Sequence, residues 1–475
     1  MEIPSELIAE LERRLAPDEW TTEMEQREIH GRDETEDLRF LPDLVVRPRS
    51  LDGVVRTLEL AHQFRVPVTP RGGGTGLSGG ALPVHGGIVL STDRLNRIRK
   101  IDRQDMVAVV EPGVITQTLQ EEVESLGLYY PPDPASRGSC TIGGNLAENA
   151  GGPHAVKYGV TADYVMGLRA VLADGTLVNC GGACRKDVAG YDLTHLFVGS
   201  EGTLAVIVEA TLRLIPKPSR RELFLAPFPT LRAGLDGVLK VLAKLTPSAC
   251  EFLERAAVAA AAEHLQRPMP FPDAAAFVLM EVDGHSDAEV ETQMLAAAEL
   301  LEEAGAGEVA VAMTDREKED LWALRRAAGE AVKALSIYKE EDCAVPRSRI
   351  VDLVTGVKEV ADRHGITTIC YGHAGDGNIH VNVLRMGMDN RTWLEVLPNV
   401  IEEIFTLTVG LGGTITGEHG VGWTQRRYLP IQFSPAELNL LRAVKRALDP
   451  VGILNPDKVL PDATAGRRPR RPSEE

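Results

Sequence analysis

The stretch Pro70-Arg-Gly-Gly-Gly-Thr-Gly-Leu-Ser-Gly-Gly80 dominates the first half of this chain of 475 residues. A segment so rich in glycine can bring backbone N–H groups against a ligand, because no Cβ blocks the approach. Successive N–H groups then form a nest for phosphate oxygens. The β-branched run at residues 66–69 predicts a strand that enters the loop. The pattern is neither the dinucleotide fingerprint G-x-G-x-x-G nor a Walker loop, so a flexible surface loop is an equal alternative for this stretch taken alone.

Two more glycine-rich segments follow it. Residues 131–164 contain the pairs Gly143-Gly144 and Gly151-Gly152 with Asn149 between them, and residues 199–207 form a third loop that leads into a β-branched strand. Few packing purposes need so many glycines and amides this close together, whereas a ligand pressed along the backbone does. Three such loops within one domain indicate a long cofactor that lies across it.

Composition excludes several classes of protein. The formal net charge of −18 argues against a general nucleic-acid or anionic-membrane surface. The six cysteines are scattered, and Cys180 and Cys184 have the wrong spacing for a metal or iron–sulfur ligand pair, so free thiols are predicted. The acidic N-terminus lacks the apolar run of a signal peptide, and no run of about 18 apolar residues could span a membrane. We therefore expect a cytoplasmic chain without an integral membrane segment.

The sequence pattern divides the chain into four parts. Residues 1–37 are predicted to be a lead-in of short acidic helices, and residues 38–218 alternate strand-like and helical runs up to a boundary at Pro216-Lys-Pro218. Residues 219–460 mix long alanine- and leucine-rich helices with strands, which indicates an α+β fold. Residues 461–475 are polar and proline-rich, and are predicted to be disordered.

Single elements can be predicted within these parts. Apolar residues at helical spacing predict a helix over residues 51–64, and an apolar run predicts a strand over residues 276–282. Residues 391–460 are expected to be mostly helical.

The three glycine-rich loops, together with Lys186-Asp-Val-Ala-Gly-Tyr-Asp-Leu193, resemble the FAD domain of the vanillyl-alcohol oxidase superfamily. Within that superfamily the chain is similar to the FAD-linked D-2-hydroxy-acid dehydrogenases, from about residue 38 to residue 460. The resemblance implies a PCMH-type FAD-binding domain of two α/β subdomains over residues 38–218. An α+β substrate and metal domain with a C-terminal helical segment would follow over residues 219–460.

The resemblance also implies where FAD binds. Residues 71–77 would contact the pyrophosphate, and residues 132–159 and 202–207 would contact the isoalloxazine, ribityl and adenine groups. Some members attach the flavin to a histidine at the position of Thr75, so FAD is expected to be non-covalent here, and a bulky residue at Gly73 is expected to block the pyrophosphate. The adjacent Tyr129 and Tyr130 are expected in the core. The candidate cofactor residues are Arg71, Gly72, Gly73, Gly74, Thr75, Gly76, Leu77, Pro132, Gly143, Gly144, Asn149, Gly152, Tyr158, Gly159, Glu201, Gly202, Ile207 and Asn455.

Histidines and a carboxylate gather in the C-terminal half. The run Tyr371-Gly-His-Ala-Gly-Asp-Gly-Asn-Ile-His-Val-Asn-Val383 predicts two strands joined by a tight turn. The period of two puts His380 and Asn382 on one face of the second strand, and His373 can meet His380 across the turn.

A second run, Gly412-Gly-Thr-Ile-Thr-Gly-Glu-His-Gly-Val-Gly422, places Glu418 and His419 between glycines, where burial without partners would be costly. Two histidines and one carboxylate suit a three-ligand divalent site with open positions. Zinc, manganese and iron remain open as the metal, and so does a purely structural role for the trio.

The resemblance assigns roles to these positions. It implies that His373, His380 and Glu418 bind the metal, that Asn382 contacts the substrate and that His419 is the catalytic base. Arg325, in Trp322-Ala-Leu-Arg325, would hold the substrate carboxylate, a task that suits a bidentate guanidinium.

Two positions depart from the pattern of members that act on D-2-hydroxyglutarate. Those members carry a lysine two residues before the aspartate of an Asp-x-x-x-Pro segment, whereas this chain has Glu340 there and Lys339 one position away. Gly329 stands where that subgroup has threonine. A small monocarboxylate is therefore favoured over a dicarboxylate.

We therefore expect FAD-dependent oxidation of a small D-2-hydroxy acid, glycolate or D-lactate, with metal assistance and hydride transfer to flavin N5. The closest resemblance is to flavin subunits of glycolate oxidases, which implies a second flavoprotein-like chain, an iron–sulfur chain and peripheral attachment to the inner membrane through a partner. The alternatives are a D-2-hydroxyglutarate dehydrogenase, a metal-dependent hydrolase or oxygenase that uses the 2-His-1-Glu site, an electron-relay subunit, and a self-sufficient homodimer.

Overall fold

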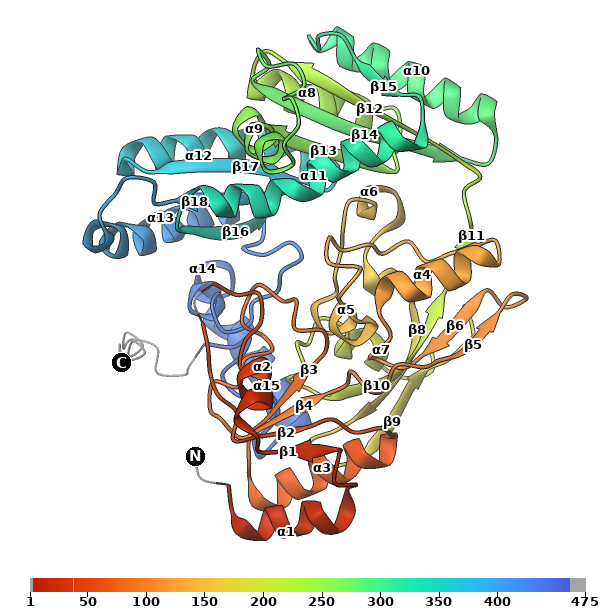
Figure 1. The fold of residues 1–475 in the computed structure, drawn as a ribbon, viewed down its shortest axis with the longest axis vertical. Helices are drawn as coiled ribbons and strands as arrows, with labels where there is room; N and C mark the ends of the chain where they lie inside the picture. Colours follow the sequence, from red (N-terminus) through yellow and green to blue (C-terminus); the bar gives the residue numbers. More distant parts are fainter. Residues whose placement is uncertain (1–2, 37, 462–475) are drawn as a thin grey trace.

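The computed structural model describes residues 3–36 and 38–461, so the predicted disordered tail lies outside the described residues apart from Pro461. Figure 1 shows two modules, one above the other. The first module is formed by residues 3–36, 38–216 and 435–461, and the second module by residues 217–434. Both combine sheets with helices, and the α+β organisation predicted from the sequence is confirmed.

The first sheet of the first module has the strand order β1-β2-β4-β3. Strands β2 and β3 run parallel to β4, and β1 pairs antiparallel with β2, so the predicted helical lead-in also supplies an edge strand to this sheet. The expected helix over residues 51–64 is present as α3, which begins at the Ser50 N-cap and ends at Arg65 in the left-handed conformation. The elements are α1 (Ser5–Arg14), β1 (Trp20–Thr21), α2 (Met24–His30), β2 (Leu44–Val46), α3 (Leu51–Phe64), β3 (Val68–Arg71) and β4 (Ile88–Ser91).

The second sheet of the first module is antiparallel, in the order β5-β6-β10-β8-β9. Tyr130 is fully buried in its core and Tyr129 nearly so, which confirms the expected core position of this pair. The elements are β5 (Ile98–Asp102), β6 (Val107–Val110), α4 (Thr116–Ser125), β7 (Leu128–Tyr129), α5 (Ile142–Glu148), α6 (Ala155–Tyr158), η1 (Thr161–Tyr164), β8 (Val165–Val171), β9 (Leu177–Gly181), α7 (Leu193–Phe197), β10 (Val206–Arg213) and β11 (Ile215–Pro216), which pairs with β7.

The end of the chain returns to the first module. Helix α15 (Pro435–Leu448) packs through Val444 and Leu448 against the core of the second sheet, and Leu454 forms a parallel bridge with Val68 of β3 (Figure 1). Ile453 and Leu454 join the same buried core as Val68. The last described residues therefore lie against the strand that leads into the glycine-rich loop.

The second module is built on one antiparallel sheet of seven strands, in the order β15-β12-β14-β13-β17-β18-β16. Helices α8, α10, α12 and α13 cover one face, and α9 and α11 cover part of the other. The elements are β12 (Arg220–Phe228), α8 (Leu231–Leu242), β13 (Ala249–Glu254), α9 (Arg255–His264), β14 (Ala276–Gly284), α10 (Asp287–Glu303), β15 (Ala310–Ala312), α11 (Asp315–Leu335), β16 (Tyr338–Ala344), η2 (Arg347–Arg349), α12 (Ile350–His364), β17 (Thr367–Gly372), β18 (Asn378–Leu384), α13 (Asn390–Gly410), η3 (Arg426–Tyr428) and α14 (Leu429–Gln432).

Strand β18 shows the predicted alternation. Ile379, Val381 and Val383 face the core beneath α12 and α13, while His380 and Asn382 lie on the opposite face. That opposite face is turned toward the first module, so the polar side chains of the sheet point into the space between the modules.

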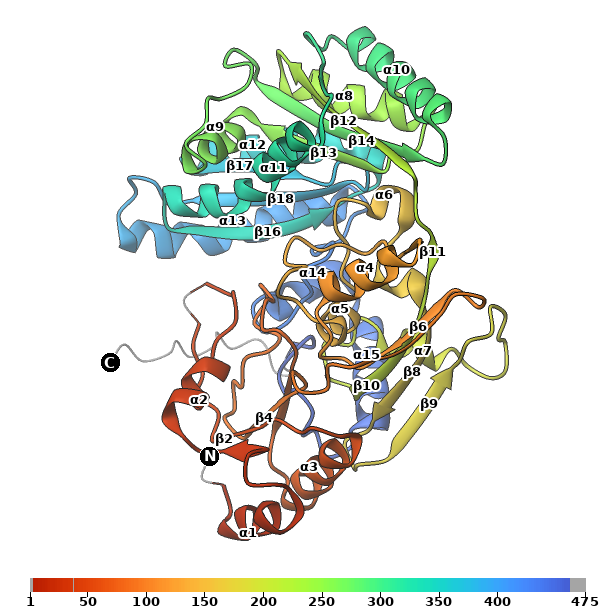
Figure 2. The ribbon, with the colours of Figure 1, turned by 45° about the vertical axis from the view of Figure 1, so that its right-hand side comes forward.

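Polar contacts from α6 join the two modules. Figure 2 shows α6 beneath the sheet of the second module. The hydroxyl of Tyr158 donates to Oδ2 of Asp283 at 2.6 Å, and Lys157 Nζ donates to the Asp283 carbonyl oxygen at 3.0 Å. Among the described residues, no helix is both long and apolar enough to cross a membrane.

Candidate active site

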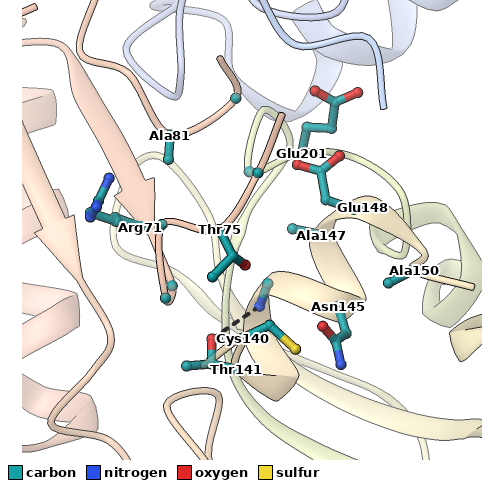
Figure 3. Close-up of a pocket in the computed structure, with 18 of the residues that line it drawn as sticks. Arg71, Thr75, Ala81, Cys140, Thr141, Asn145, Ala147, Glu148, Ala150 and Glu201 are labelled. Carbon is teal, nitrogen blue, oxygen red and sulfur yellow. Dashed lines mark hydrogen bonds between the residues drawn. The ribbon is translucent and has the colours of Figure 1, made fainter. Parts of the chain in front are cut away.

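A cavity of about 240 Å³ lies in the first module, between its two sheets and beneath the three glycine-rich loops (Figure 3). Strand β3 delivers the first loop to this cavity, α5 begins at its edge, and the loop before β10 closes it. Twelve of the candidate cofactor residues line it: Arg71, Gly72, Gly73, Gly74, Thr75, Gly76, Leu77, Gly143, Gly144, Glu201, Gly202 and Ile207. Glu418 and His419 of the second module line the same cavity.

The other six candidates, Pro132, Asn149, Gly152, Tyr158, Gly159 and Asn455, do not line the cavity. Several of them brace its walls instead. Asn455 Nδ2 donates to the carbonyl oxygens of Gly80 and Glu201, at 2.9 and 2.8 Å, and so ties the first loop to the third. Asn149 Oδ1 accepts the N–H of Ala162 at 2.8 Å. Cofactor binding at these six positions stays a prediction; Asn455 and Asn149 support the loops, and Tyr158 contacts the second module.

Two glycines of the first loop differ in what surrounds them. A Cβ on Gly73 would meet the carbonyl oxygen of Ser139 at 2.6 Å, whereas a Cβ on Gly76 would meet nothing within 4 Å. We expected a side chain at Gly73 to occupy the space of the pyrophosphate. That reason is wrong, because a Cβ at Gly73 would point at the backbone of the neighbouring loop. Gly76 lines the cavity and has open space at the position of a Cβ, which fits a ligand pressed against the loop.

A larger cleft of about 1270 Å³ separates the modules and opens into the cavity. Thr75, Leu77, Glu418 and His419 line both spaces. A molecule in the cleft can therefore reach the end of the cavity that is marked by His419.

A histidine cluster stands at this junction. The Nε2 atoms of His373 and His380 lie 3.2 and 3.6 Å from the same oxygen, Oε1 of Glu418. The ring of His419 stacks on that of His380, with centroids 5.1 Å apart and an angle of 12° between the planes. Two overlapping trios bring possible ligand atoms within 4.8 Å of one another: His373, His380 and Glu418, and Glu340, His380 and His419.

The charge states of the two sheet histidines differ. Burial, aided by the neighbouring His419, lowers the pKa of His380 to about 4, which leaves its ring neutral and able to bind a metal. Burial also opposes the charge on His373, but the carboxylates of Glu251 and Glu418 outweigh it and raise the pKa of His373 well above its usual value. A proton held between two carboxylates marks a position that favours positive charge, and a divalent cation can replace that proton. The first trio therefore fits a metal.

Asp342 positions the loop that carries Glu418 and His419. Its Oδ2 accepts the backbone N–H groups of Gly417, Glu418 and His419 at 2.8, 2.7 and 2.9 Å. Its Oδ1 accepts from Asn378 Nδ2 at 2.6 Å. Burial opposes ionisation, yet His419, His380 and the N–H of Glu418 hold the pKa of Asp342 below its usual value. The buried carboxylate thus fixes the loop against β16 and β18.

Arg325 and Trp322 lie one turn apart on α11, and each contacts a buried glutamate of the sheet. Arg325 Nε donates to Oε2 of Glu251 at 2.6 Å, and Oε1 of Glu251 lies 2.8 Å from Nδ1 of His373. Trp322 Nε1 donates to Oε2 of Glu281 at 3.1 Å. Glu251 therefore links the predicted carboxylate-binding arginine directly to a predicted metal ligand.

Glu340 and Asn382 occupy different positions relative to the cleft. Glu340 lines the cleft, pairs with Lys333 Nζ at 3.1 Å and accepts from the Tyr371 hydroxyl at 3.3 Å. Burial opposes its charge, but Lys333 and His419 lower the pKa of Glu340 to about 2. Asn382 is fully buried and lines neither the cleft nor the cavity.

The sequence analysis missed several buried acids of this region. Glu251 lies in β13, which also contains Glu254, and Glu281 lies in β14, which also contains Asp283. Glu251 and Glu281 both contact side chains of α11. His154 of the first module bridges Asp133 and Glu281, with contacts of 2.6 and 3.0 Å. An acidic residue between apolar residues of a buried strand was a usable signal, because an unpaired buried carboxylate is costly. The partners of these glutamates are distant in the sequence, so the pairings could not be predicted from it.

Comparison with known protein families gives two matches. Residues 42–181 match the model "FAD binding domain", and residues 217–459, just over half of the chain, match "FAD linked oxidases, C-terminal domain". The chain belongs to the FAD-linked oxidase family. Most of the residues that line the cavity of the first module lie within the matched FAD binding domain, and the histidine cluster lies within the matched C-terminal domain.

Individual relatives and structures agree with the family match. The "Glycolate oxidase subunit GlcD" of Bacillus subtilis (strain 168) is 40% identical over 91% of this chain and 92% of the relative. A "D-lactate dehydrogenase" of Anaerostipes hadrus is 35% identical over 88% and 89% of the two chains, and a "D-2-hydroxyglutarate dehydrogenase" of Stutzerimonas stutzeri (strain A1501) is 33% identical over 95% and 98%. A solved structure of p-cresol methylhydroxylase with substrate bound has a TM-score of 0.80 at 16% identity, over 96% of each chain, and supports the fold. The protein is thus an FAD-dependent hydroxy-acid oxidoreductase.

Substitution in the first loop tests this flavin cavity. We expect Gly76→Val to weaken FAD binding at least about tenfold with little change in thermal stability, because the new side chain enters the cavity without meeting protein atoms. Fluorescence titration of the apoprotein with FAD measures the effect. Gly73→Ala is the matched control and should instead lower thermal stability, since its Cβ meets the Ser139 carbonyl oxygen. Unchanged FAD affinity in Gly76→Val would contradict the placement.

Proposed function

We propose that this protein oxidises a small D-2-hydroxy acid, glycolate or D-lactate, to the 2-oxo acid, with non-covalent FAD and one divalent metal. The observation that carries the proposal is the convergence of Arg325, the histidine cluster and the mouth of the flavin cavity on one cleft. Relatives named for glycolate and D-lactate support the choice of substrate.

Arg325 is the proposed anchor for the substrate carboxylate. It lines the cleft and is 8% exposed, and its Nε is committed to Glu251, so the guanidinium is held in a fixed orientation. Its remaining N–H groups can bind a carboxylate in a bidentate manner. A lysine could not replace it, because an ammonium lacks the planar fork.

His419 is the proposed base that takes the hydroxyl proton. Burial lowers its basicity, but Asp342, Glu340 and Glu418 outweigh burial and raise the pKa of His419. Its ring borders both the cleft and the flavin cavity, so it can accept a proton from a substrate that lies at their junction. Asn382 lies two residues from His380 on the same face of β18, and its contact with the substrate stays a prediction.

The bound groups would supply the remaining chemistry. His373, His380 and Glu418 would hold a divalent metal that acidifies the substrate hydroxyl as a Lewis acid, and FAD would accept the Cα hydride at N5. Thr75 supports non-covalent binding, because it lines the cavity and has no nucleophilic nitrogen. A hydrolase or oxygenase that uses the 2-His-1-Glu trio is the weaker alternative, since the flavin cavity opens onto the same cleft.

The charge in the cleft favours a monocarboxylate over D-2-hydroxyglutarate. Glu340 places a buried negative charge beside His380, and Lys333 is already paired with that carboxylate. A second substrate carboxylate at this end of the cleft would be repelled unless it displaced Glu340 from Lys333.

Electron transfer after substrate oxidation is proposed to involve a partner. One relative is named a subunit of glycolate oxidase, which supports assembly with other chains, here a second flavoprotein-like chain and an iron–sulfur chain at the cytoplasmic side of the inner membrane. None of the six cysteines, all within the described residues, forms a disulfide, and their spacing offers no iron–sulfur ligand pair. A homodimer that uses a diffusible acceptor is the alternative.

Anaerobic bleaching of the bound flavin tests the substrate. Glycolate or D-lactate should bleach the flavin absorbance at least about tenfold faster than D-2-hydroxyglutarate, and L-lactate should be slow because Arg325 and His419 fix one face of Cα. Stopped-flow absorbance measures the rates. Fastest bleaching by D-2-hydroxyglutarate would overturn the monocarboxylate assignment while leaving the hydroxy-acid activity intact.

Loss of a metal ligand tests the metal. His380→Ala should lower the metal content per chain and slow flavin reduction about 100-fold or more, while the flavin spectrum stays unchanged. Elemental analysis and anaerobic reduction measure both effects. His195→Ala, at a half-exposed histidine paired with Asp192 on α7, is the control and should change neither. Equal metal content in His380→Ala and wild type, or full activity after chelation, would contradict the proposed metal site.

The choice of electron acceptor tests the partner. The isolated, substrate-reduced protein should react slowly with oxygen and rapidly with an artificial dye, because the physiological acceptor would be a separate chain. Parallel assays of hydrogen peroxide production and dye reduction give the two rates. Peroxide production as fast as dye reduction would show that the chain needs no partner.

A further inference from the structure

Two buried glutamates meet at the end of the flavin cavity. Glu148 is the last residue of α5 and Glu201 lies in the loop before β10, and Figure 3 shows their carboxyl groups side by side. Both line the cavity. A Cβ on Gly80 would lie 3.1 Å from an oxygen of Glu148 and 3.6 Å from one of Glu201. The two acids therefore share one small space.

Glu201 is supported as an anion. Its Oε1 accepts the N–H of Val421 at 2.8 Å, and its Oε2 accepts the N–H of Gly422 at 2.7 Å. These donors belong to the loop that follows His419. Backbone donors to both oxygens stabilise the charged form of a carboxylate.

Glu148 lacks comparable support. Its Oε2 is buried and has no hydrogen-bond partner among residues 3–36 and 38–461. The charged groups that act on it are Glu201, Asp33 and Lys458, and burial, Glu201 and Asp33 raise the pKa of Glu148 well above its usual value against the opposing effect of Lys458. Two adjacent carboxyls in a closed space do not both ionise. Burial raises the pKa of Glu201 too, but the N–H groups of Val421 and Gly422 oppose that rise. These backbone donors therefore favour the shared negative charge on Glu201 and the proton on Glu148.

The position of Glu148 indicates a role for its proton as a hydrogen-bond donor. Glu148 and Glu201 lie against Gly420, directly after His419, at the end of the cavity that opens to the substrate cleft. If the protein oxidises its substrate by hydride transfer, as proposed above, the flavin ring system must lie at this end. A neutral acid can donate a hydrogen bond to a ring carbonyl oxygen or nitrogen without adding charge.

We propose that Glu148 is a protonated carboxylic acid that donates a hydrogen bond to the flavin ring and thereby favours its reduction. The donor stabilises the negative charge that the ring gains with two electrons, and it does so from a fixed position in a buried site. Glu201 acts through Glu148, because its anchored negative charge keeps the proton on its neighbour.

The test compares two substitutions of nearly equal size. Glu148→Gln keeps a neutral donor, whereas Glu148→Leu removes the donor. The midpoint potential of the bound flavin is measured by equilibration with a reference dye, without substrate, so the result does not depend on which acid is oxidised. Glu148→Gln should keep the wild-type potential, and Glu148→Leu should lower it.

Infrared spectroscopy gives a second measurement on the wild-type holoenzyme. The reduced-minus-oxidised difference spectrum should contain the shifted carbonyl stretch of a protonated carboxylic acid, and this band should be absent in Glu148→Gln.

A raised flavin potential in Glu148→Gln would mean that a negative charge had been removed, and would overturn the proposal. So would an unchanged potential in Glu148→Leu, or the absence of the infrared band from wild type. If Glu148→Leu does not retain FAD, the Glu148→Gln potential and the infrared band decide.

Discussion

The buried carboxylate of Asp342 is the interaction on which the site depends. It gathers three consecutive backbone N–H groups of residues 417–419, and each hydrogen bond to a charged group contributes about 1.5–3 kcal/mol. Without it the N–H groups of Glu418 and His419 would lose these partners. The loop would then be held to β16 mainly through backbone bonds from Gly417 to Asp342 and between Thr414 and Ala344. With the Asp342 carboxylate, Glu418 meets the two sheet histidines and His419 meets the mouth of the flavin cavity. One side chain, which lines neither the cleft nor the cavity, thus brings the proposed metal site and the proposed base to the proposed cofactor site.

The sheet of the second module provides the fixed frame for the substrate. Glu251 contacts both Arg325 and His373, so the proposed carboxylate anchor and metal ligand share one carboxylate. Glu281 holds Trp322 one turn earlier on α11 and also contacts His154 of the first module. The orientation of α11 therefore depends on how the modules dock. This arrangement places the proposed substrate site in the cleft between the modules rather than within either one.

The sequence predicted those features of the fold that depend on residues close together in the chain. The alternation along β18 placed His380 opposite the core residues, and glycine density located the loops of the flavin cavity. Long-range pairings could not be predicted in this way. Asp342 and Glu418 lie 76 residues apart, and Asn455 contacts Gly80 at the end of the first loop, so no local pattern in the sequence predicts either contact. The surroundings of Gly73 could not be predicted either, because the backbone next to it comes from residue 139.

The most direct test is the rate of anaerobic flavin reduction by the best 2-hydroxy acid in Asp342→Asn. If Asp342 assembles the site, the variant keeps its full complement of FAD, because the flavin cavity is formed chiefly by the first module. Its flavin should be reduced at least about 100-fold more slowly, since displacement of Glu418 and His419 by even an ångström removes their alignment. Reduction at the wild-type rate would contradict the account, because it would show that the loop finds its position without this carboxylate.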